Sequence, residues 1–391
     1  MKKLGRLSKA PVQPLAVALF VLGLCVLASR NIGSLQAALW HSQQLLNISS
    51  VKMKGVDHGS RCALRNYSYL YEPPETRYQN RVVVFVFAGR QSRLEVQLPY
   101  LEQLVVDGEI DYVHYSVCRP DAKDYTWLQY LAKVMPLWFE LKEYNITDAR
   151  KADAFFIATY NEYRAAKYRN TMLVKIDDDI VFLPLGGAIT HAVEYARANP
   201  NAAWVSGLVV NHPIYDNWLQ EEGIIPYRAQ MDFTRIHNED GILGNQNNTI
   251  YAEQRLSWRS LHSFFLENSS IFKNLQGTRI VPAGSRVSLN FMIFSPEHVW
   301  DWNLRGEIFD EWRIMKWTLE TNRTVHLFKG ATAVHFDYGR QRRIKGMVDE
   351  DYLLRYMAFA CSQILSHQEE NGCANTFYLY KKQCSSNVAN N

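Results

Sequence analysis

The chain has 391 residues, of which 47% are hydrophobic, 13% aromatic and 21% charged. This balance is typical of a globular protein, because disordered chains are poorer in apolar and aromatic side chains. The 43 basic and 39 acidic residues leave a formal net charge of +4, which is too dilute over this length for a nucleic-acid-binding protein. Collagen-like, coiled-coil, multi-span membrane and cysteine-dense small proteins are excluded as well. We therefore expect a globular, catalytic body.

The N-terminus carries an uncharged apolar stretch over residues 10–29, preceded by several basic residues. A helix of about 20 residues crosses the hydrocarbon core of a bilayer, and basic residues in front of it keep the N-terminus in the cytosol. We expect a cytoplasmic tail over 1–9 and a transmembrane signal-anchor over 10–29, which makes a single-pass type II protein of the Golgi or ER membrane. The alternative is a cleaved signal peptide, because small residues near Ala28 suit a signal peptidase. In both cases the body of the chain is exported.

Sequons and cysteines agree with export. An Asn-x-Ser/Thr sequon accepts a glycan only in the secretory pathway, and the sequons lie at Asn47, Asn66, Asn145, Asn247, Asn268 and Asn322. No pair of cysteines has the C-x-x-C spacing of a metal site. A disulfide among the three C-terminal cysteines (Cys361, Cys373 and Cys384) suits an oxidising lumen. Five cysteines lie outside the apolar stretch, so at least one should stay free or pair with another chain.

Residues 30–80 are polar and end in a proline-containing segment, which predicts a stem rather than regular structure. Strands and helices then alternate along the chain. Continuous β-branched and aromatic runs predict buried strands at 81–90, 110–117, 138–141, 171–176 and 203–210. Amphipathic spacing predicts helices over 93–106, 125–134, 152–168 and 188–198.

This alternation predicts an α/β fold with a mostly parallel sheet covered by helices on both faces. Ligands of such sheets bind at the carboxyl ends of the strands, near a topological switch point. The pattern becomes irregular after Asn211. We therefore divide the body into a regular, nucleotide-binding half over 81–210, a less regular half over 211–345, and a C-terminal helix with a cysteine-containing tail over 346–391.

The sharpest chemical feature is the triplet Asp177, Asp178 and Asp179, which directly follows a predicted buried strand. Adjacent carboxylates repel one another unless a cation neutralises them, and sites of the Mg²⁺ type combine one or two carboxylates with substrate phosphates. Alternate residues of an extended segment face the same side. Asp177 and Asp179 are therefore expected to bind one metal ion while Asp178 points elsewhere. The alternatives are an acidic turn and an adventitious calcium loop.

A second feature is His335, which follows an apolar run and precedes a basic segment. A neutral imidazole there suits the same metal ion, and the guanidinium groups of the segment suit phosphate oxygens. These basic residues are Arg340, Arg342, Arg343 and Lys345. The alternative is an ordinary structural histidine followed by a solvated loop.

Two smaller features complete the set. Asp310 and Glu311 stand beside aromatic residues, as a general base would, although acidic residues also favour a helix N-terminus. Gly89 and Arg90 end the first predicted strand, where a nucleotide would meet the sheet, or where a simple turn would carry a surface arginine. Motifs of P-loop NTPases, dinucleotide enzymes, α/β-hydrolases and zincins are absent from the sequence.

Taken together, these segments resemble Golgi-type, type II membrane glycosyltransferases of the GT-A fold, and they are similar to poorly characterised microbial and fungal GT-A-like proteins. The run 175–182 is similar to the D-x-D motif of that fold. The resemblance implies a Rossmann-like first half that binds a nucleotide sugar and a C-terminal half that binds the acceptor and completes the metal site.

The same resemblance implies roles for single residues. Asp177, Asp179 and His335 would hold Mn²⁺ or Mg²⁺, and Asp310 or Glu311 would act at the acceptor. The donor would be bound by Gly89, Arg90, Lys175, Asp178, Arg340, Arg342 and Arg343.

We therefore expect a metal-dependent transfer of sugar from a nucleotide diphosphate to a glycan or glycoprotein, with no nucleic acid involved. Two other classes remain open. One is a metal-dependent phosphodiesterase or nucleotide-sugar hydrolase. The other is a glycan-binding protein that kept this fold and lost catalysis.

Overall fold

The computed structural model describes residues 75–118, 120–146, 152–225, 255–285, 287–302, 310–337 and 348–371. The expected cytoplasmic tail, the membrane segment and nearly all of the stem lie outside these residues. Within them, no helix combines the length and the apolar character that a membrane span requires.

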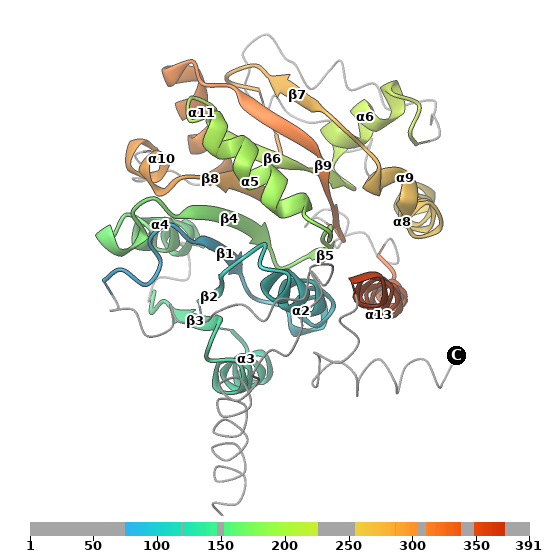
Figure 1. The fold of residues 1–391 in the computed structure, drawn as a ribbon, viewed down its shortest axis with the longest axis horizontal. Coiled ribbons are helices and arrows are strands. Elements are labelled where there is room, and N and C mark those ends of the chain that lie inside the picture. The colour runs from blue at the N-terminus through green and yellow to red at the C-terminus, as the bar shows by residue number, and fades with distance from the viewer. Residues whose placement is uncertain are drawn as a thin grey trace, which may run out of the picture. The chain divides into compact units, whose positions relative to one another are not determined.

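The strands form one nine-stranded sheet with the order β3-β2-β1-β4-β8-β6-β9-β5, and β7 pairs with β9 (Figure 1). Their bounds are β1 (Val82–Phe87), β2 (Tyr112–Val117), β3 (Phe139–Glu143), β4 (Met172–Asp177), β5 (Ile180–Phe182), β6 (Trp204–Val210), β7 (Thr278–Val281), β8 (Phe291–Phe294) and β9 (Val325–His335). Most strands run in the same direction, since β3, β2, β1 and β4 pair in parallel and β6 pairs in parallel with β9. The exceptions are β8, β5 and β7, which pair antiparallel with their neighbours. The expectation of an α/β fold with a mostly parallel sheet is confirmed.

The second half of the chain is more regular than the sequence indicated. β8 pairs with both β4 and β6, and β9 pairs with β6, so strands from beyond Asn211 lie inside the same sheet as the early ones. The four residues of β8 are all buried. The sheet is therefore shared by both halves.

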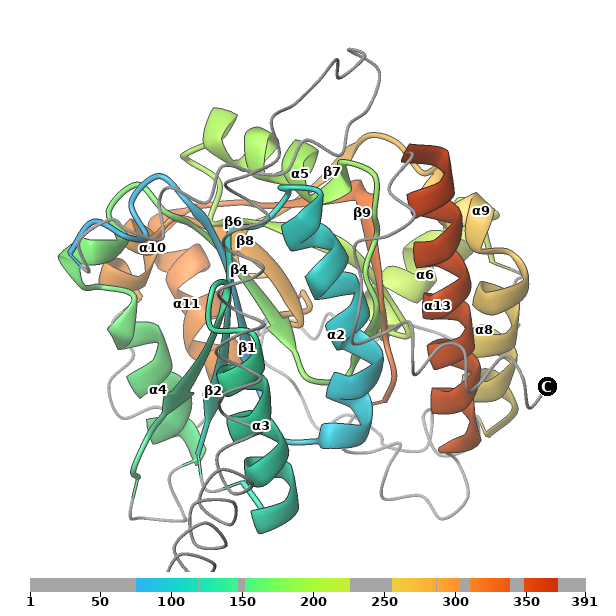
Figure 2. The same cartoon turned by 60° about the horizontal axis from the view of Figure 1, so that its bottom comes forward.

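Helices cover both faces of the sheet. They are α2 (Gln91–Val106), α3 (Ala122–Val134), α4 (Ala152–Glu162), the 3₁₀ turn η2 (Ala166–Tyr168), α5 (Ala188–Ala198), α6 (Pro213–Glu221), α8 (Arg255–Glu267), α9 (Ser269–Lys273), α10 (Pro296–Asp301), α11 (Asp310–Thr321) and α13 (Asp351–Asn371). Figure 2 shows α2 and α3 on one side of β1 and β2 and α4 on the other. The helix expected over 152–168 is interrupted, because it ends at Glu162 and only the short η2 follows.

The core is continuous through the sheet and rich in aromatic rings. On the α4 side, the rings of Phe85 and Phe87 pack edge-to-face against Tyr160, with centroids 5.8 and 5.7 Å apart. On the α2 side, Tyr100 packs against Phe182 of β5 at 5.4 Å. Five of the six residues of β1 and five of the six of β4 are buried, which explains why these strands are continuous apolar runs. The polar residues that follow them are held on a rigid edge.

Candidate functional site

The candidate site lies at the carboxyl ends of β1 and β4. These two strands pair in parallel with Phe87 opposite Asp177, so Arg90 and the acidic triplet meet at the same edge. The chain connects β1 outward to β2 on one side, and it reaches β4 on the other side only later, which makes this a topological switch point. The predicted placement of the acidic triplet at the carboxyl end of a buried parallel strand is confirmed.

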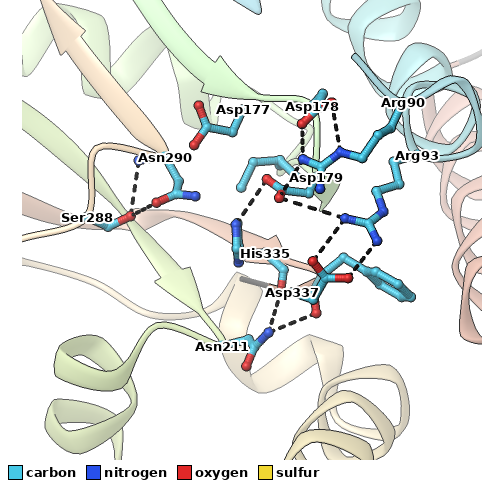
Figure 3. Close-up of polar contacts among 12 residues, drawn as sticks. Arg90, Arg93, Asp177, Asp178, Asp179, Asn211, Ser288, Asn290, His335 and Asp337 are labelled. Atoms are coloured by element: carbon cyan, nitrogen blue, oxygen red, sulfur yellow. Dashed lines mark hydrogen bonds and ion pairs between the residues drawn. The ribbon is translucent and has the colours of Figure 1, made fainter. Parts of the chain in front are cut away.

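The three carboxylates do not alternate as an extended segment would. β4 ends at Asp177, and Asp178 and Asp179 form a turn. Both turn carboxylates accept hydrogen bonds from Arg90: its Nε lies 2.9 Å from Asp178 Oδ2 and its Nη2 lies 2.7 Å from Asp179 Oδ2, and Nη2 also bonds Asp178 Oδ1 (Figure 3). The expectation that Asp177 and Asp179 share one side while Asp178 points elsewhere was therefore wrong, because the chain leaves the extended conformation after Asp177.

Asp177 is held by a different cation. Lys175 Nζ lies 2.5 Å from Asp177 Oδ1 and also donates to the carbonyl oxygen of Leu289 at 2.6 Å. Lys175 is 3% exposed, whereas the Asp177 side chain is 26% exposed. Lys175 thus fixes the one carboxylate of the triplet that solvent reaches readily.

His335 is brought to the acidic turn from the far end of the chain. It is the last residue of β9, and it stands opposite Ile180 in the pairing of β9 with β5. This places its Nε2 atom 3.0 Å from Asp179 Oδ1, and the next amide, that of Phe336, donates to the carbonyl oxygen of Asp179 at 2.7 Å. The predicted proximity of His335 to the acidic triplet is confirmed.

Several buried residues that the sequence did not single out hold this arrangement in place. Gln97 of α2 donates to the carbonyl oxygens of Asp177 and Ile180, at 2.8 and 3.2 Å. Arg93 of α2 binds Asp337 through two hydrogen bonds of 3.0 and 2.6 Å. Their sequence positions show only ordinary helix spacing, so no local signal identifies them.

The electrostatics of the turn follow from burial and from the arginines. Burial raises the pKa of Asp178 to about 6, Arg90 opposes this rise, and the neighbouring carboxylates add to it. Burial also disfavours the charge on Asp179, but His335, Arg90 and Arg93 outweigh it and hold the pKa of Asp179 well below its usual range. Burial disfavours the charge on Arg90 in turn, yet the two carboxylates raise its pKa above the ordinary value. The turn thus carries a firmly ionised carboxylate next to an imidazole.

Asp179 and His335 offer two donor types that divalent metal ions accept, a carboxylate oxygen and an imidazole nitrogen. A carboxylate oxygen and an imidazole nitrogen point at each other 3.0 Å apart, and sites of the Mg²⁺ type take their remaining ligands from phosphates and water. Among the described residues, no group of three or more His, Cys, Asp or Glu side chains is assembled around one point. Asp177, the third predicted ligand, is bound to Lys175 instead.

The remaining predicted site residues are placed only in part. Gly89 is exposed and lies beside Asp178, since a Cβ on it would stand 3.4 Å from Asp178 Oδ2. Asp310 and Glu311 are the first two residues of α11, where the helix dipole favours carboxylates. The basic residues Arg340, Arg342 and Arg343 lie outside the described residues.

The sequons are placed in the same partial way. Asn145 and Asn322 are exposed, and Asn268 is half-buried with its side-chain amide donating to the carbonyl oxygen of Phe264 at 2.9 Å. Asn47, Asn66 and Asn247 lie outside the described residues. Of the cysteines, Cys118 is a free thiol and Cys361 takes part in a disulfide.

Comparison of the chain with models of known protein families gives no match. Comparison with curated proteins gives no match either.

Proposed function

We propose that this protein is a metal-dependent glycosyltransferase that moves a sugar from a nucleotide diphosphate to a glycan or glycoprotein in the secretory pathway. The observation that carries the proposal is the meeting of Asp179 and His335, 3.0 Å apart, at the carboxyl edge of β1 and β4. A residue of the turn after β4 and the last residue of β9 thus converge where α/β sheets bind nucleotides. The resemblance of the acidic triplet to the D-x-D motif supports the same conclusion.

In this proposal Asp179 and His335 would hold Mn²⁺ or Mg²⁺, and the ion would supply positive charge to the donor diphosphate. The chain's own cations have matching tasks. Arg90, which pairs with Asp178 and Asp179, is assigned to diphosphate oxygens. Lys175 orients Asp177 from a buried position. Arg340, Arg342 and Arg343 are assigned to the donor as well.

The bond changes are those of sugar transfer. The bond between the anomeric carbon and the diphosphate oxygen breaks, and the acceptor hydroxyl oxygen forms a new bond to that carbon. We assign Asp310 or Glu311, in the first turn of α11, to take the hydroxyl proton. The nucleotide diphosphate leaves with the electron pair of the broken bond.

Topology and compartment belong to the same proposal. The apolar stretch over 10–29 acts as the membrane anchor, and the body lies in the lumen of the Golgi or ER. The disulfide at Cys361 and the exposed sequon at Asn145 support an oxidising, glycosylating compartment.

One observation favours a second candidate, a glycan-binding protein without catalysis. In the structure the cations of Arg90 and Lys175 pair with all three carboxylates, so the repulsion within the triplet is reduced without a metal ion. A charge cluster of this kind also serves a purely structural role. Catalysis by such a protein would be absent with every donor.

The test is a screen of nucleotide sugars with the purified full chain. Nucleotide release is measured with Mn²⁺ and with EDTA, each with and without a mixed pool of glycan acceptors. The transferase proposal requires release that depends on metal and rises with acceptor. Metal-dependent nucleotide release that is the same with and without acceptor would establish a hydrolase instead. No release from any donor, together with glycan binding that EDTA does not diminish, would establish the inactive binding protein.

A further inference from the structure

Asn211 holds the backbone of the residue that faces Asp179. It directly follows β6, whose last residue, Val210, pairs with Val334 of β9. Its side-chain Nδ2 atom donates to the carbonyl oxygens of both His335 and Phe336, at 2.9 Å each (Figure 3). Asn211 is 3% exposed, so these bonds are shielded from water.

The backbone conformation explains why a side chain does this task. Asn211 has a φ of +65°, in the left-handed region that asparagine tolerates better than most residues. The chain therefore turns away from β9 at this point, and the regular pairing of β6 with β9 stops at Val210. Beyond that point, the side-chain amide of Asn211 donates to the carbonyl oxygens of His335, the last residue of β9, and of Phe336, the residue after it. Its own backbone N–H donates to Asp216 Oδ1 at 3.0 Å, which fixes the turn.

The segment that Asn211 holds is also held from the other side. The backbone N–H of Phe336 donates to the carbonyl oxygen of Asp179 at 2.7 Å. Its carbonyl oxygen accepts further bonds from Trp258 Nε1 at 2.7 Å and from His262 Nε2 at 3.0 Å. Trp258 and His262 thus support residue 336, whereas Asn211 reaches residue 335 as well.

We propose that Asn211 is a positioning residue that sets the ring of His335 against Asp179 and thereby sets the affinity of the site for its metal ion. The inference rests on the proposed function only in taking His335 as a metal ligand. Residues that orient metal ligands typically change metal affinity by about 10- to 100-fold when removed. Asn211 would belong to that group although it contacts only the backbone of the ligand.

The experiment compares Asn211→Gly with the wild-type full chain. Glycine keeps the left-handed backbone and removes the amide. Asn170→Gly is the matched control, because Asn170 also has a left-handed φ, of +59°, and precedes β4 at the opposite edge of the sheet. Asn211→Asp, which keeps the size and loses both N–H donors, is a second variant in case the glycine variant does not fold. Mn²⁺ affinity is measured from the EPR signal of the free ion.

We expect Asn211→Gly and Asn211→Asp to weaken Mn²⁺ binding about tenfold or more, and Asn170→Gly to leave it within about twofold. Wild-type affinity in both Asn211 variants, with weakened binding in His335→Ala, would overturn the positioning role and leave the metal site intact. Wild-type affinity in His335→Ala would instead contradict the metal role of His335, which belongs to the proposed function.

A second measurement decides the inference without metal. Histidines are labelled with ¹⁵N, and the ring of His335 is assigned from its loss in His335→Gln. In the wild type the ring of His335 lies with Nε2 3.0 Å from Asp179 Oδ1, so its ring ¹⁵N signals report this contact. We expect both Asn211 variants to shift these signals, because the ring moves relative to the carboxylate. A ring spectrum identical to that of the wild type would overturn the inference, whether or not the protein binds Mn²⁺.

Discussion

Removing one partner of the buried ion pair between Arg93 and Asp337 should be among the most destabilising side-chain changes near the site. The two side chains are 4% and 0% exposed, and two hydrogen bonds of 3.0 and 2.6 Å join them. Arg93→Met keeps much of the apolar stem and removes the guanidinium, which leaves a buried carboxylate without its cation. Removing one partner of such a pair costs about 3–5 kcal/mol. The contact of Arg93 with Glu350 adds little, because Glu350 is 63% exposed.

The assay is urea unfolding followed by circular dichroism, with the free energy of unfolding extrapolated to water. Lys316→Met is the matched control, since Lys316 pairs with Glu320 at 3.9 Å on the surface and its loss should cost about 0.5 kcal/mol or less. Adding Asp337→Asn to Arg93→Met should recover part of the loss, because the buried charge is then gone. A loss below about 1 kcal/mol in Arg93→Met, or no recovery in the double variant, would refute the reasoning.

Three further outcomes follow from single residues. Burial lowers the pKa of His114 from 6.5 to about 3, so below pH 6.5 the unfolded chain binds a proton that the folded chain does not, and the free energy of unfolding falls. Between pH 6.5 and 5, the free energy of unfolding measured in urea should therefore fall by about 1.5 kcal/mol less in His114→Gln than in the wild type. An equal fall in both proteins would contradict this. Gln97→Leu removes two hydrogen bonds to the carbonyls of the acidic turn and should cost about 2 kcal/mol in the same assay; an unchanged midpoint would argue against its role. Gly207→Ala should lower the free energy of unfolding by about 3 kcal/mol, because the new Cβ would collide with the ring of Phe291. Gly89→Ala should change it by no more than about 0.5 kcal/mol, because a Cβ there meets only an ordinary contact. Similar thermal midpoints for the two variants would contradict this.

The parts of the site that could be predicted are those that depend on local pattern and a general rule. A buried strand followed by three aspartates places the triplet at a carboxyl edge, whatever the remainder of the chain does. The apolar run before His335 likewise marks the end of a strand. His335 meets Asp179 because Asp179 directly precedes β5, whose first residue, Ile180, pairs with His335 at the end of β9.

The parts that escaped prediction depend on contacts between distant segments. β8 has only four residues, and nothing in its sequence shows that it pairs between β4 and β6. Gln97 and Arg93 occupy ordinary positions of an amphipathic helix, and only their distant partners make them important. The turn at Asp178 also depends on Arg90, whose guanidinium bridges two carboxylates that an extended chain would have separated.

The glycosyltransferase proposal depends most on Asp179, and its replacement gives the most direct test. Nucleotide release is measured with Mn²⁺, the donor identified in the screen and its acceptor, for the wild type, for Asp179→Asn and for Asp121→Asn. Asp121 caps α3 by accepting from the backbone N–H of Asp124 at 2.9 Å, a task that asparagine performs equally well, so this control should keep full activity. We predict that Asp179→Asn loses metal-dependent transfer by about a hundredfold or more, as expected when several kcal/mol of charge stabilisation is removed, while it stays folded. Full metal-dependent turnover in Asp179→Asn would contradict the proposal.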